Sequence, residues 1–134
     1  MIDSVKFGNR NLYIVGCEPI PARVLLEDFI LLLPAYNEID VSRSLATARS
    51  SLRPNCKEYC CAGPFATELE DKIDWFLEDA GCFITTSSSL DVVEACEYFL
   101  FASDGGVAPI LIAVVSNFIE LDDILRKIVR ACSL

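Results

Sequence analysis

Residues 56–89 read CKEYCCAGPFATELEDKIDWFLEDAGCFITTSSS, and this stretch contains the alternation of elements that decides the fold. It opens with an apolar, cysteine-rich run at 56–62, which predicts a buried strand. Gly63 and Pro64 then turn the chain into a helix, because proline is well accommodated in the first helical turn. The stretch therefore begins as a strand, a tight turn and a helix.

The helix is predicted over residues 65–80, and Gly81 is expected to end it as a left-handed cap. Its apolar side chains share one arc at about 100° per residue, namely Leu69, Ile73, Phe76, Leu77 and Ala80. A short strand is expected at 82–85. A hydroxyl-rich turn at 86–89 then offers caps for a following helix.

The same strand–helix alternation is expected along the rest of the chain. Further strands are predicted at 12–15, 29–33 and 109–115, and further helices at 41–52, 90–102 and 119–132. Strands that are apolar throughout, separated by helices, favour a parallel sheet covered on both faces. We predict a three-layer α/β sandwich with a mostly parallel sheet of four or five strands, flavodoxin-like or Rossmann-like. It forms a single domain over 1–134, in which residues 1–27 are less regular.

Composition places the chain among globular proteins, since 53% of its residues are hydrophobic and 23% are charged. Its longest apolar runs are far shorter than the roughly 20 residues that cross a bilayer. The N-terminal residues lack the apolar segment of a secretory signal. We therefore expect a cytoplasmic protein with no membrane contact.

The cysteines are expected to be free thiols. There are seven, no two of them form a CxxC pair, and the chain has no histidine. Structural zinc sites are built from such pairs, so no metal site is predicted. No glycine-rich phosphate motif is present, and no cofactor is predicted. The seven thiols are Cys17, Cys56, Cys60, Cys61, Cys82, Cys96 and Cys132.

The negative charge is concentrated in one part of the chain. Net charge is −9, while residues 1–67 contain seven acids and seven bases and residues 105–134 contain three of each. Residues 68–104 contain ten acids and a single base, Lys72. A surface of this sign repels nucleic acid and anionic membranes, so neither is expected as a partner.

Short motifs along residues 29–117 resemble those of an uncharacterised family of small bacterial α/β domains of unknown function. The matching residues are the apolar run Phe29–Leu33, then Tyr59, Ala62, Gly63, Pro64, Asp71, Ile73, Asp74, Trp75, Phe83, Thr85, Thr86, Leu90 and Glu94. The chain departs from that pattern at Ser87-Ser88, where the family has Trp-His, and at Leu69, where it has Trp. The resemblance implies an α/β fold and a bacterial origin, and it supplies no activity.

One hypothesis for function places a ligand at the carboxyl ends of the strands, where open parallel sheets bind their ligands. The candidate residues are Gly63, Thr85, Thr86, Ser87, Ser88 and Asn117. Hydroxyls and backbone amides at a helix N-terminus could hold an anion, although a serine that merely caps the helix explains the same pattern. Without histidine, Ser-His and Cys-His pairs are impossible, and no catalytic residue is predicted.

The other hypothesis concerns aromatic side chains on the polar sides of the two acidic helices. The candidate partner-binding residues are Glu68, Asp71, Asp74, Trp75, Asp79, Asp91, Glu94, Tyr98 and Phe101. Aromatic anchors surrounded by charge are typical of interfaces, although packing on a neighbouring element explains the aromatics as well. We interpret the chain as a non-enzymatic, immunity-, antitoxin- or inhibitor-like protein that binds a basic protein partner. The alternative is a small-molecule or anion-binding domain, or an enzyme, with its site at the strand ends. Oligomeric state stays open.

Overall fold

A computed structural model describes residues 2–16 and 18–132, and it has a sheet of six strands with four α-helices. The strands are β1 (Ile2–Phe7), β2 (Arg10–Val15), β3 (Phe29–Pro34), β4 (Cys56–Ala62), β5 (Thr85–Ser89) and β6 (Ile110–Val114). The helices are α1 (Glu38–Ser50), α2 (Ala66–Ala80), α3 (Val92–Glu97) and α4 (Ile119–Ala131). Single 3₁₀ turns lie at Ala22–Leu25 and Ser103–Gly106.

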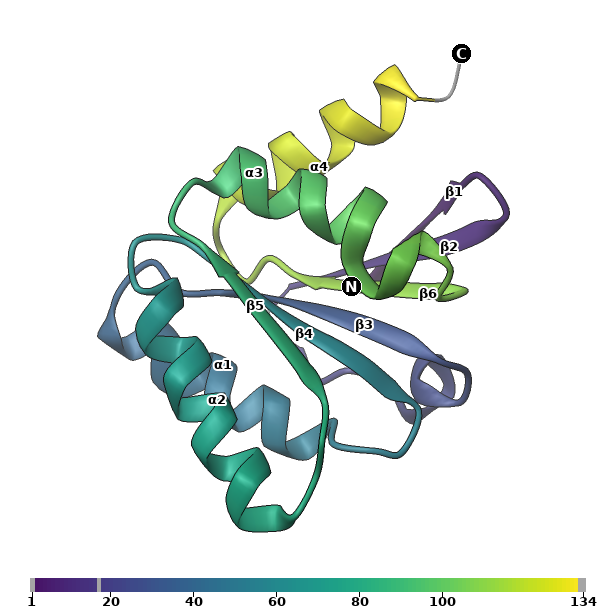
Figure 1. The fold of residues 1–134 in the computed structure, drawn as a ribbon. Coiled ribbons are helices and arrows are strands. Elements are labelled where there is room, and N and C mark those ends of the chain that lie inside the picture. The colour runs from purple at the N-terminus through teal and green to yellow at the C-terminus, as the bar shows by residue number, and fades with distance from the viewer. Residues whose placement is uncertain (1, 17, 133–134) are drawn as a thin grey trace.

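The strands lie in the order β1-β2-β6-β3-β4-β5 (Figure 1). Strand β1 is antiparallel to β2, and every other neighbouring pair is parallel. This confirms the predicted α/β class and the mostly parallel sheet. The predicted count of four or five strands is wrong, because β1 adds a sixth.

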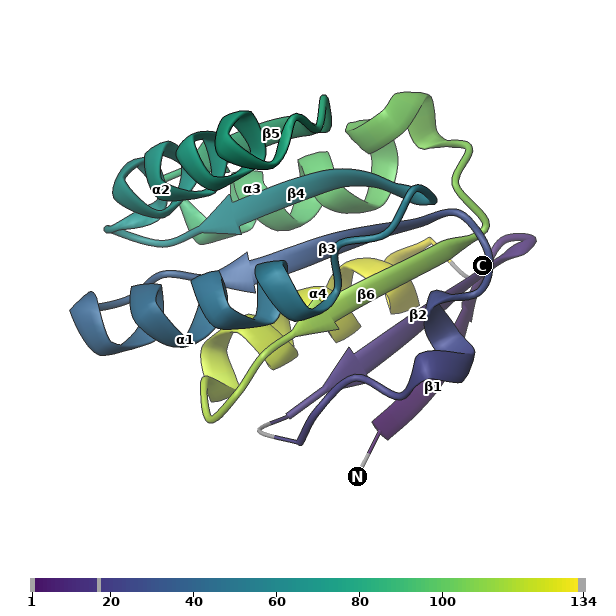
Figure 2. The same ribbon diagram turned by 90° about the horizontal axis from the view of Figure 1, so that it is seen from below.

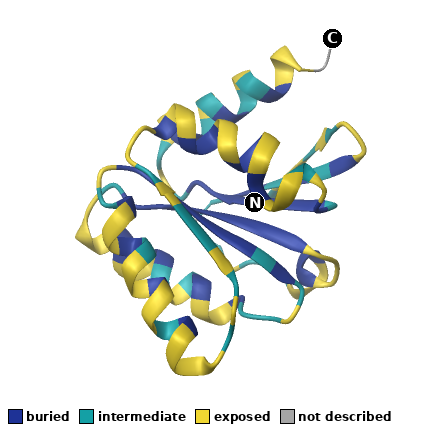
Figure 3. Ribbon diagram, in the orientation of Figure 1, coloured by how far each residue is buried: buried dark blue, intermediate teal, exposed yellow. Residues whose placement is uncertain are grey.

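Helices cover both faces of the sheet, as Figures 1 and 2 show. Helices α1 and α2 pack on one face, over Leu31, Leu33 and Tyr59, while α3 and α4 pack on the other, over Ile30 and Leu32. All six residues of β3 are buried as a result, while exposed residues lie on the outer surfaces of the helices, in the loops and in the β1–β2 hairpin (Figure 3). The two acidic helices, α2 and α3, therefore lie on opposite faces of the sheet.

The N-terminal segment is more regular than predicted. Strands β1 and β2 form a hairpin, with Ile2 opposite Val15 and Phe7 opposite Arg10. The turn contains Gly8 at a φ of 65°, a left-handed conformation that glycine adopts at no steric cost. Strand β1 escaped prediction because it lies at the sheet edge and alternates only weakly between apolar and polar residues.

Strand β5 corrects the assignment of residues 82–89. The strand is Thr85–Ser89, and residues 82–84 form an irregular connection, so the predicted hydroxyl-rich turn is itself the strand. Its five side chains are all hydroxyls, and they offer no apolar alternation that would mark a strand. Backbone pairing with β4 and side-chain hydrogen bonds hold it in place instead.

Three helix ends also differ in detail. Helix α1 begins at Glu38 with Asn37 as its cap, rather than at residue 41, and Asp91 rather than a serine caps α3, accepting hydrogen bonds from two backbone amides. The predicted helix at 90–102 is an α-helix only to Glu97 and continues as a π-helical turn, Tyr98–Ala102. Gly81 ends α2 at a φ of 71°, as predicted.

Cys56, Cys60, Cys61, Cys82, Cys96 and Cys132 are free thiols in the structure, and Cys17 lies outside the described residues. Burial raises the pKa of the Cys56 thiol to about 11 and that of Cys96 to about 12. A high thiol pKa suppresses the reactive thiolate, so these two cysteines behave as small core residues. Within residues 2–16 and 18–132, no helix has the length and apolar content to cross a membrane.

Candidate interaction edge

Among residues 2–16 and 18–132, strand β5 ends the sheet and pairs only with β4. In Figure 1 it runs between α2 and α3. The Ser89 carbonyl accepts a hydrogen bond from the Gly63 amide at 3.1 Å, so the backbone of Ser89 faces β4. Backbone direction alternates along a parallel strand. The amide and carbonyl groups of Thr86 and Ser88 therefore point away from the sheet.

Two carboxylates of α2 hold the hydroxyls on one side of β5. The Thr86 hydroxyl lies 3.0 Å from a Glu70 oxygen and 2.6 Å from an Asp74 oxygen. The Ser88 hydroxyl donates to the other Glu70 oxygen at 2.6 Å. An ionised carboxylate accepts hydrogen bonds and donates none. The hydroxyls of β5 therefore supply the donors that orient these two acids along the strand.

A buried carboxylate, Glu58 on β4, lies under the other side of β5. It is 1% exposed. One of its oxygens accepts from the Ser87 hydroxyl at 2.9 Å and from the Tyr98 phenol at 2.7 Å. Its other oxygen accepts from the Asp104 amide at 3.0 Å, and the Cys60 thiol lies 3.6 Å from the first. Glu58 thus connects β4 to β5, to the π-helical turn at Tyr98 and to the turn at Asp104.

Tyr98 is therefore a structural residue as much as a surface one. Burial, and then the hydrogen bond to Glu58, raise the pKa of the phenol well above its ordinary value. The ring is still 38% exposed. It lines a cleft of about 320 Å³ between β5 and α3, together with Ser87, Ser89 and Glu94.

The acids around β5 have no cationic partner among the described residues. Ion pairs in residues 2–16 and 18–132 involve Asp3, Asp28 and Asp122, and none of the ten acids of 68–104 lies within 4.0 Å of a Lys or Arg nitrogen. Glu70 and Asp74 lie on the α2 side of the strand, and Glu94 lies on the α3 side. The negative charge of this edge is therefore not neutralised within that part of the chain.

Exposed apolar side chains lie at both ends of β5. Phe83 precedes the strand and is fully exposed, at 103% of its reference area, and Leu90 follows it at 61%. We call the strand Thr85–Ser89, with Glu70, Asp74, Phe83, Leu90 and Glu94 around it, the β5 edge.

The predicted partner-binding residues do not form one continuous face. Asp74, Asp91, Glu94 and Tyr98 border β5, from α2 on one side and α3 on the other. Phe101 packs on Phe7 of the N-terminal hairpin, with ring centroids 5.5 Å apart. These candidate residues therefore do not share one surface, because the sheet separates α2 from α3 and the β5 edge lies between the two helices.

The remaining predicted residues of α2 are exposed, namely Glu68, Asp71, Trp75 and Asp79. Trp75 is 76% exposed and lines a shallow groove against α1, where Arg49 and Lys72 also lie. The polar side of α2 beside α1 therefore has mixed charge, in contrast to the β5 edge.

The predicted ligand-binding residues are also separated. Thr85, Thr86, Ser87 and Ser88 lie along β5 rather than at a helix N-terminus. Gly63 serves packing, because a Cβ atom there would lie 2.7 Å from the Ala35 carbonyl oxygen, and its φ is 127°. No anion cradle forms from these residues together.

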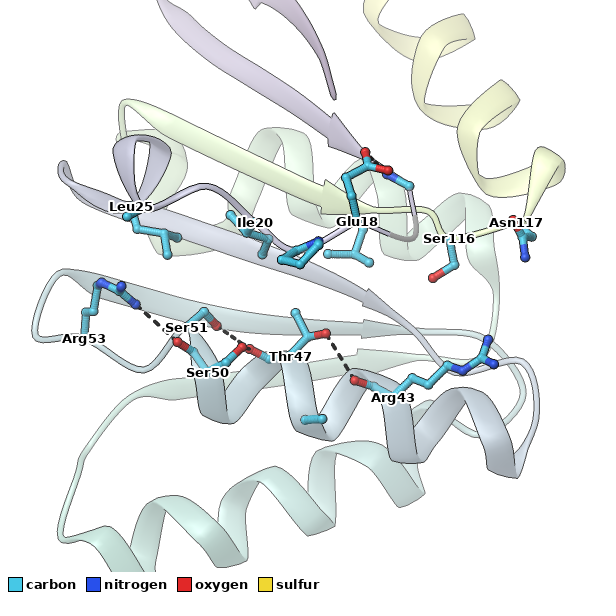
Figure 4. Close-up of a pocket in the computed structure, with 15 residues that line it drawn as sticks. Glu18, Ile20, Leu25, Arg43, Thr47, Ser50, Ser51, Arg53, Ser116 and Asn117 are labelled. Atoms are coloured by element: carbon cyan, nitrogen blue, oxygen red, sulfur yellow. Dashed lines mark hydrogen bonds between the residues drawn. The ribbon is translucent and has the colours of Figure 1, made fainter. Parts of the chain in front are cut away.

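Asn117 instead lines a separate groove of about 710 Å³ near the carboxyl end of β6. Figure 4 shows Glu18 and Asn117 on one side of this groove and Thr47 and Ser50 of α1 on the other. Arg43 and Arg53 also line it. Two cationic side chains among hydroxyls make this groove suited to a small polar ligand with negative charge.

Sequence reasoning missed Glu58, Glu70 and Phe83 as parts of the edge. A lone acid inside the cysteine-rich strand was the available signal for Glu58, because an ionisable residue in a doubly covered strand needs buried partners. No group of acids and thiols with metal-binding geometry occurs in the described part of the chain. Comparisons with protein-family models, with curated proteins and with solved structures gave no match.

Proposed function

We propose that this protein is a non-enzymatic interaction protein that binds a basic protein partner through the β5 edge. The observation that carries the proposal is an open strand edge flanked on both sides by carboxylates without a cationic partner in the described residues. A basic surface would supply the missing counter-charge. Electrostatic complementarity of this kind speeds association and makes it sensitive to salt.

The exposed apolar residues support the same role. Phe83 and Leu90 have no core function, and both lie at the ends of an acidic strand rather than scattered over the surface. Interfaces combine apolar anchors with surrounding charge. A small acidic protein that covers a basic surface fits an immunity-, antitoxin- or inhibitor-like role.

A pull-down from the native cell, at low and at high salt, tests the proposal. The test variant is Glu70→Gln, Asp74→Asn and Glu94→Gln, which removes three charges and keeps hydrogen-bond acceptors. The matched control removes three charges from exposed acids elsewhere, Glu27→Gln, Glu38→Gln and Glu120→Gln. We expect the test variant to lose a salt-sensitive basic partner and the control to retain it. Equal retention by both variants would refute the proposal.

The groove beside α1 supports a second candidate function, the binding of a small anion. Its volume of about 710 Å³ is in the range of small-molecule sites, and Arg43 and Arg53 line it. Thermal-shift measurements with a panel of phosphorylated and carboxylated metabolites would test it. A stabilising ligand whose effect disappears in Arg43→Ala would support this candidate, and the absence of any shift would contradict it.

A further inference from the structure

We propose that the basic partner presents an extended segment, which adds to the sheet as a new strand along β5. This inference rests on the proposed function and specifies how the partner is recognised. Strand addition supplies affinity through main-chain hydrogen bonds and specificity through alternating side chains.

The backbone of β5 is prepared for such an addition. Thr86 and Ser88 direct their amide and carbonyl groups outward, since Ser89 faces β4. An incoming strand could therefore make up to four backbone hydrogen bonds with these two residues. Helices α2 and α3 pack against the two faces of the sheet and leave its edge open.

The charge around the edge selects a basic occupant. Successive side chains of an added strand point to opposite faces of the sheet. On one face they would meet Glu70 and Asp74, and on the other they would enter the cleft that Glu94 lines. Lysine or arginine is thus favoured at neighbouring positions of the segment, not only at alternate ones.

A second copy of this chain is a poor occupant for the same reason. Pairing β5 with β5 would bring the carboxylates of two copies together, and like charges at close range are destabilising. Edge strands often use charge to discourage unwanted pairing. Here that charge would exclude neutral and acidic strands and admit a basic one.

The ends of the strand supply the apolar part of the recognition. Phe83 and Leu90 lie just outside its two ends and are exposed at 103% and 61%. An apolar residue at each end of the basic segment would cover these two side chains. The expected segment is therefore short, extended, basic in its middle and apolar at its ends.

The probe for this inference is a capped synthetic peptide, Ile-Lys-Arg-Thr-Lys-Arg-Thr-Ile. Its control has the same side chains and N-methyl groups on the four central backbone nitrogens, which removes pairing but keeps the charge. Binding is measured by calorimetry with the full chain at low salt. We expect the control to bind about tenfold more weakly, because lost backbone hydrogen bonds each cost about a factor of ten or less.

Amide hydrogen exchange locates the contact. On addition of the unmodified peptide, the amides of Thr86 and Ser88 should become protected, while the Ser89 amide is already covered by β4. In the protein, Ser88→Pro removes an outward amide and should weaken binding about tenfold. Ser88→Ala keeps that amide and loses only the hydroxyl, so it should bind several-fold more tightly than Ser88→Pro.

The outcomes separate the inference from the proposed function. If both peptides bind equally and Thr86 and Ser88 stay unprotected, strand addition is refuted while the basic partner stands. If neither peptide binds, strand addition is also refuted. If the three-charge test variant still binds the unmodified peptide at full strength, the proposed function fails with it.

Discussion

Replacing Glu58 by alanine tests whether this acid holds the β5 edge in place. The substitution removes the acceptor for the Ser87 hydroxyl, the Tyr98 phenol and the Asp104 amide. A hydrogen bond to a charged group contributes about 1.5–3 kcal/mol. Water can replace the acceptor for the two half-exposed hydroxyls, and losing a buried charge offsets part of the cost. We therefore expect a loss of about 3 kcal/mol in the free energy of unfolding.

Urea denaturation followed by far-UV circular dichroism measures this loss. Glu58→Gln keeps one acceptor for the Asp104 amide and should cost about 1 kcal/mol. An exposed acid of α3 provides the matched control, and Glu97→Ala should change stability by less than about 0.5 kcal/mol. A double-mutant cycle adds Tyr98→Phe, which should cost about 1 kcal/mol in the native protein and almost nothing beside Glu58→Ala. Additive losses in this cycle would refute the coupling.

Three further predictions concern burial. Iodoacetamide at pH 8, followed by peptide mapping, should label the exposed Cys132 and leave Cys96 unlabelled until urea is added, since burial raises the pKa of Cys96 to about 12. Labelling of both in the native state would contradict the packing. Burial also raises the pKa of Asp40. The charged Asp40 side chain therefore lowers the free energy of unfolding at pH values above this pKa, and this destabilisation disappears as the pH falls through the pKa. Urea titrations should therefore show a higher free energy of unfolding for Asp40→Asn than for the native protein at pH 7, and this difference should shrink towards pH 4. A difference that does not change with pH would contradict this. Trp75→Ala should change the unfolding free energy by less than about 0.5 kcal/mol, because the ring is 76% exposed, and a loss above 2 kcal/mol would show a packing role.

Much of the fold follows from hydrophobic pattern. The run at 29–33 is apolar throughout, and the structure places it in β3 at the centre of the sheet, buried on both faces. Helix α2 buries Leu69, Ile73 and Leu77 of the predicted arc, leaves Ala80 exposed, and ends at the predicted Gly81. These elements were predictable because the spacing of apolar residues within a single strand or helix shows which of its faces packs against the core.

The edges of the sheet could not be predicted in this way. Within the described part of the chain, strand β1 pairs on one side only, and Asp3, Ser4 and Lys6 break its alternation. Strand β5 has no apolar residue at all. Both segments form strands because their backbones pair with a neighbouring strand, and their own sequences do not indicate this pairing. The Gly8–Asn9 turn was the available signal for the hairpin.

The same limitation explains why the candidate site changed shape. Sequence spacing correctly located the acids on the helices, but it could not show that the sheet separates α2 from α3. The acids of the two helices meet along β5, a strand whose sequence resembles that of a polar turn. Because β5 contributes hydroxyls rather than apolar burial, its position depends on Glu58 beneath it and on Glu70 beside it. Strand β5 thus contributes no apolar side chain to the core, and the carboxylates around it have no cationic partner among the described residues. A basic strand from a partner would supply the cations and add backbone hydrogen bonds where the sheet now ends.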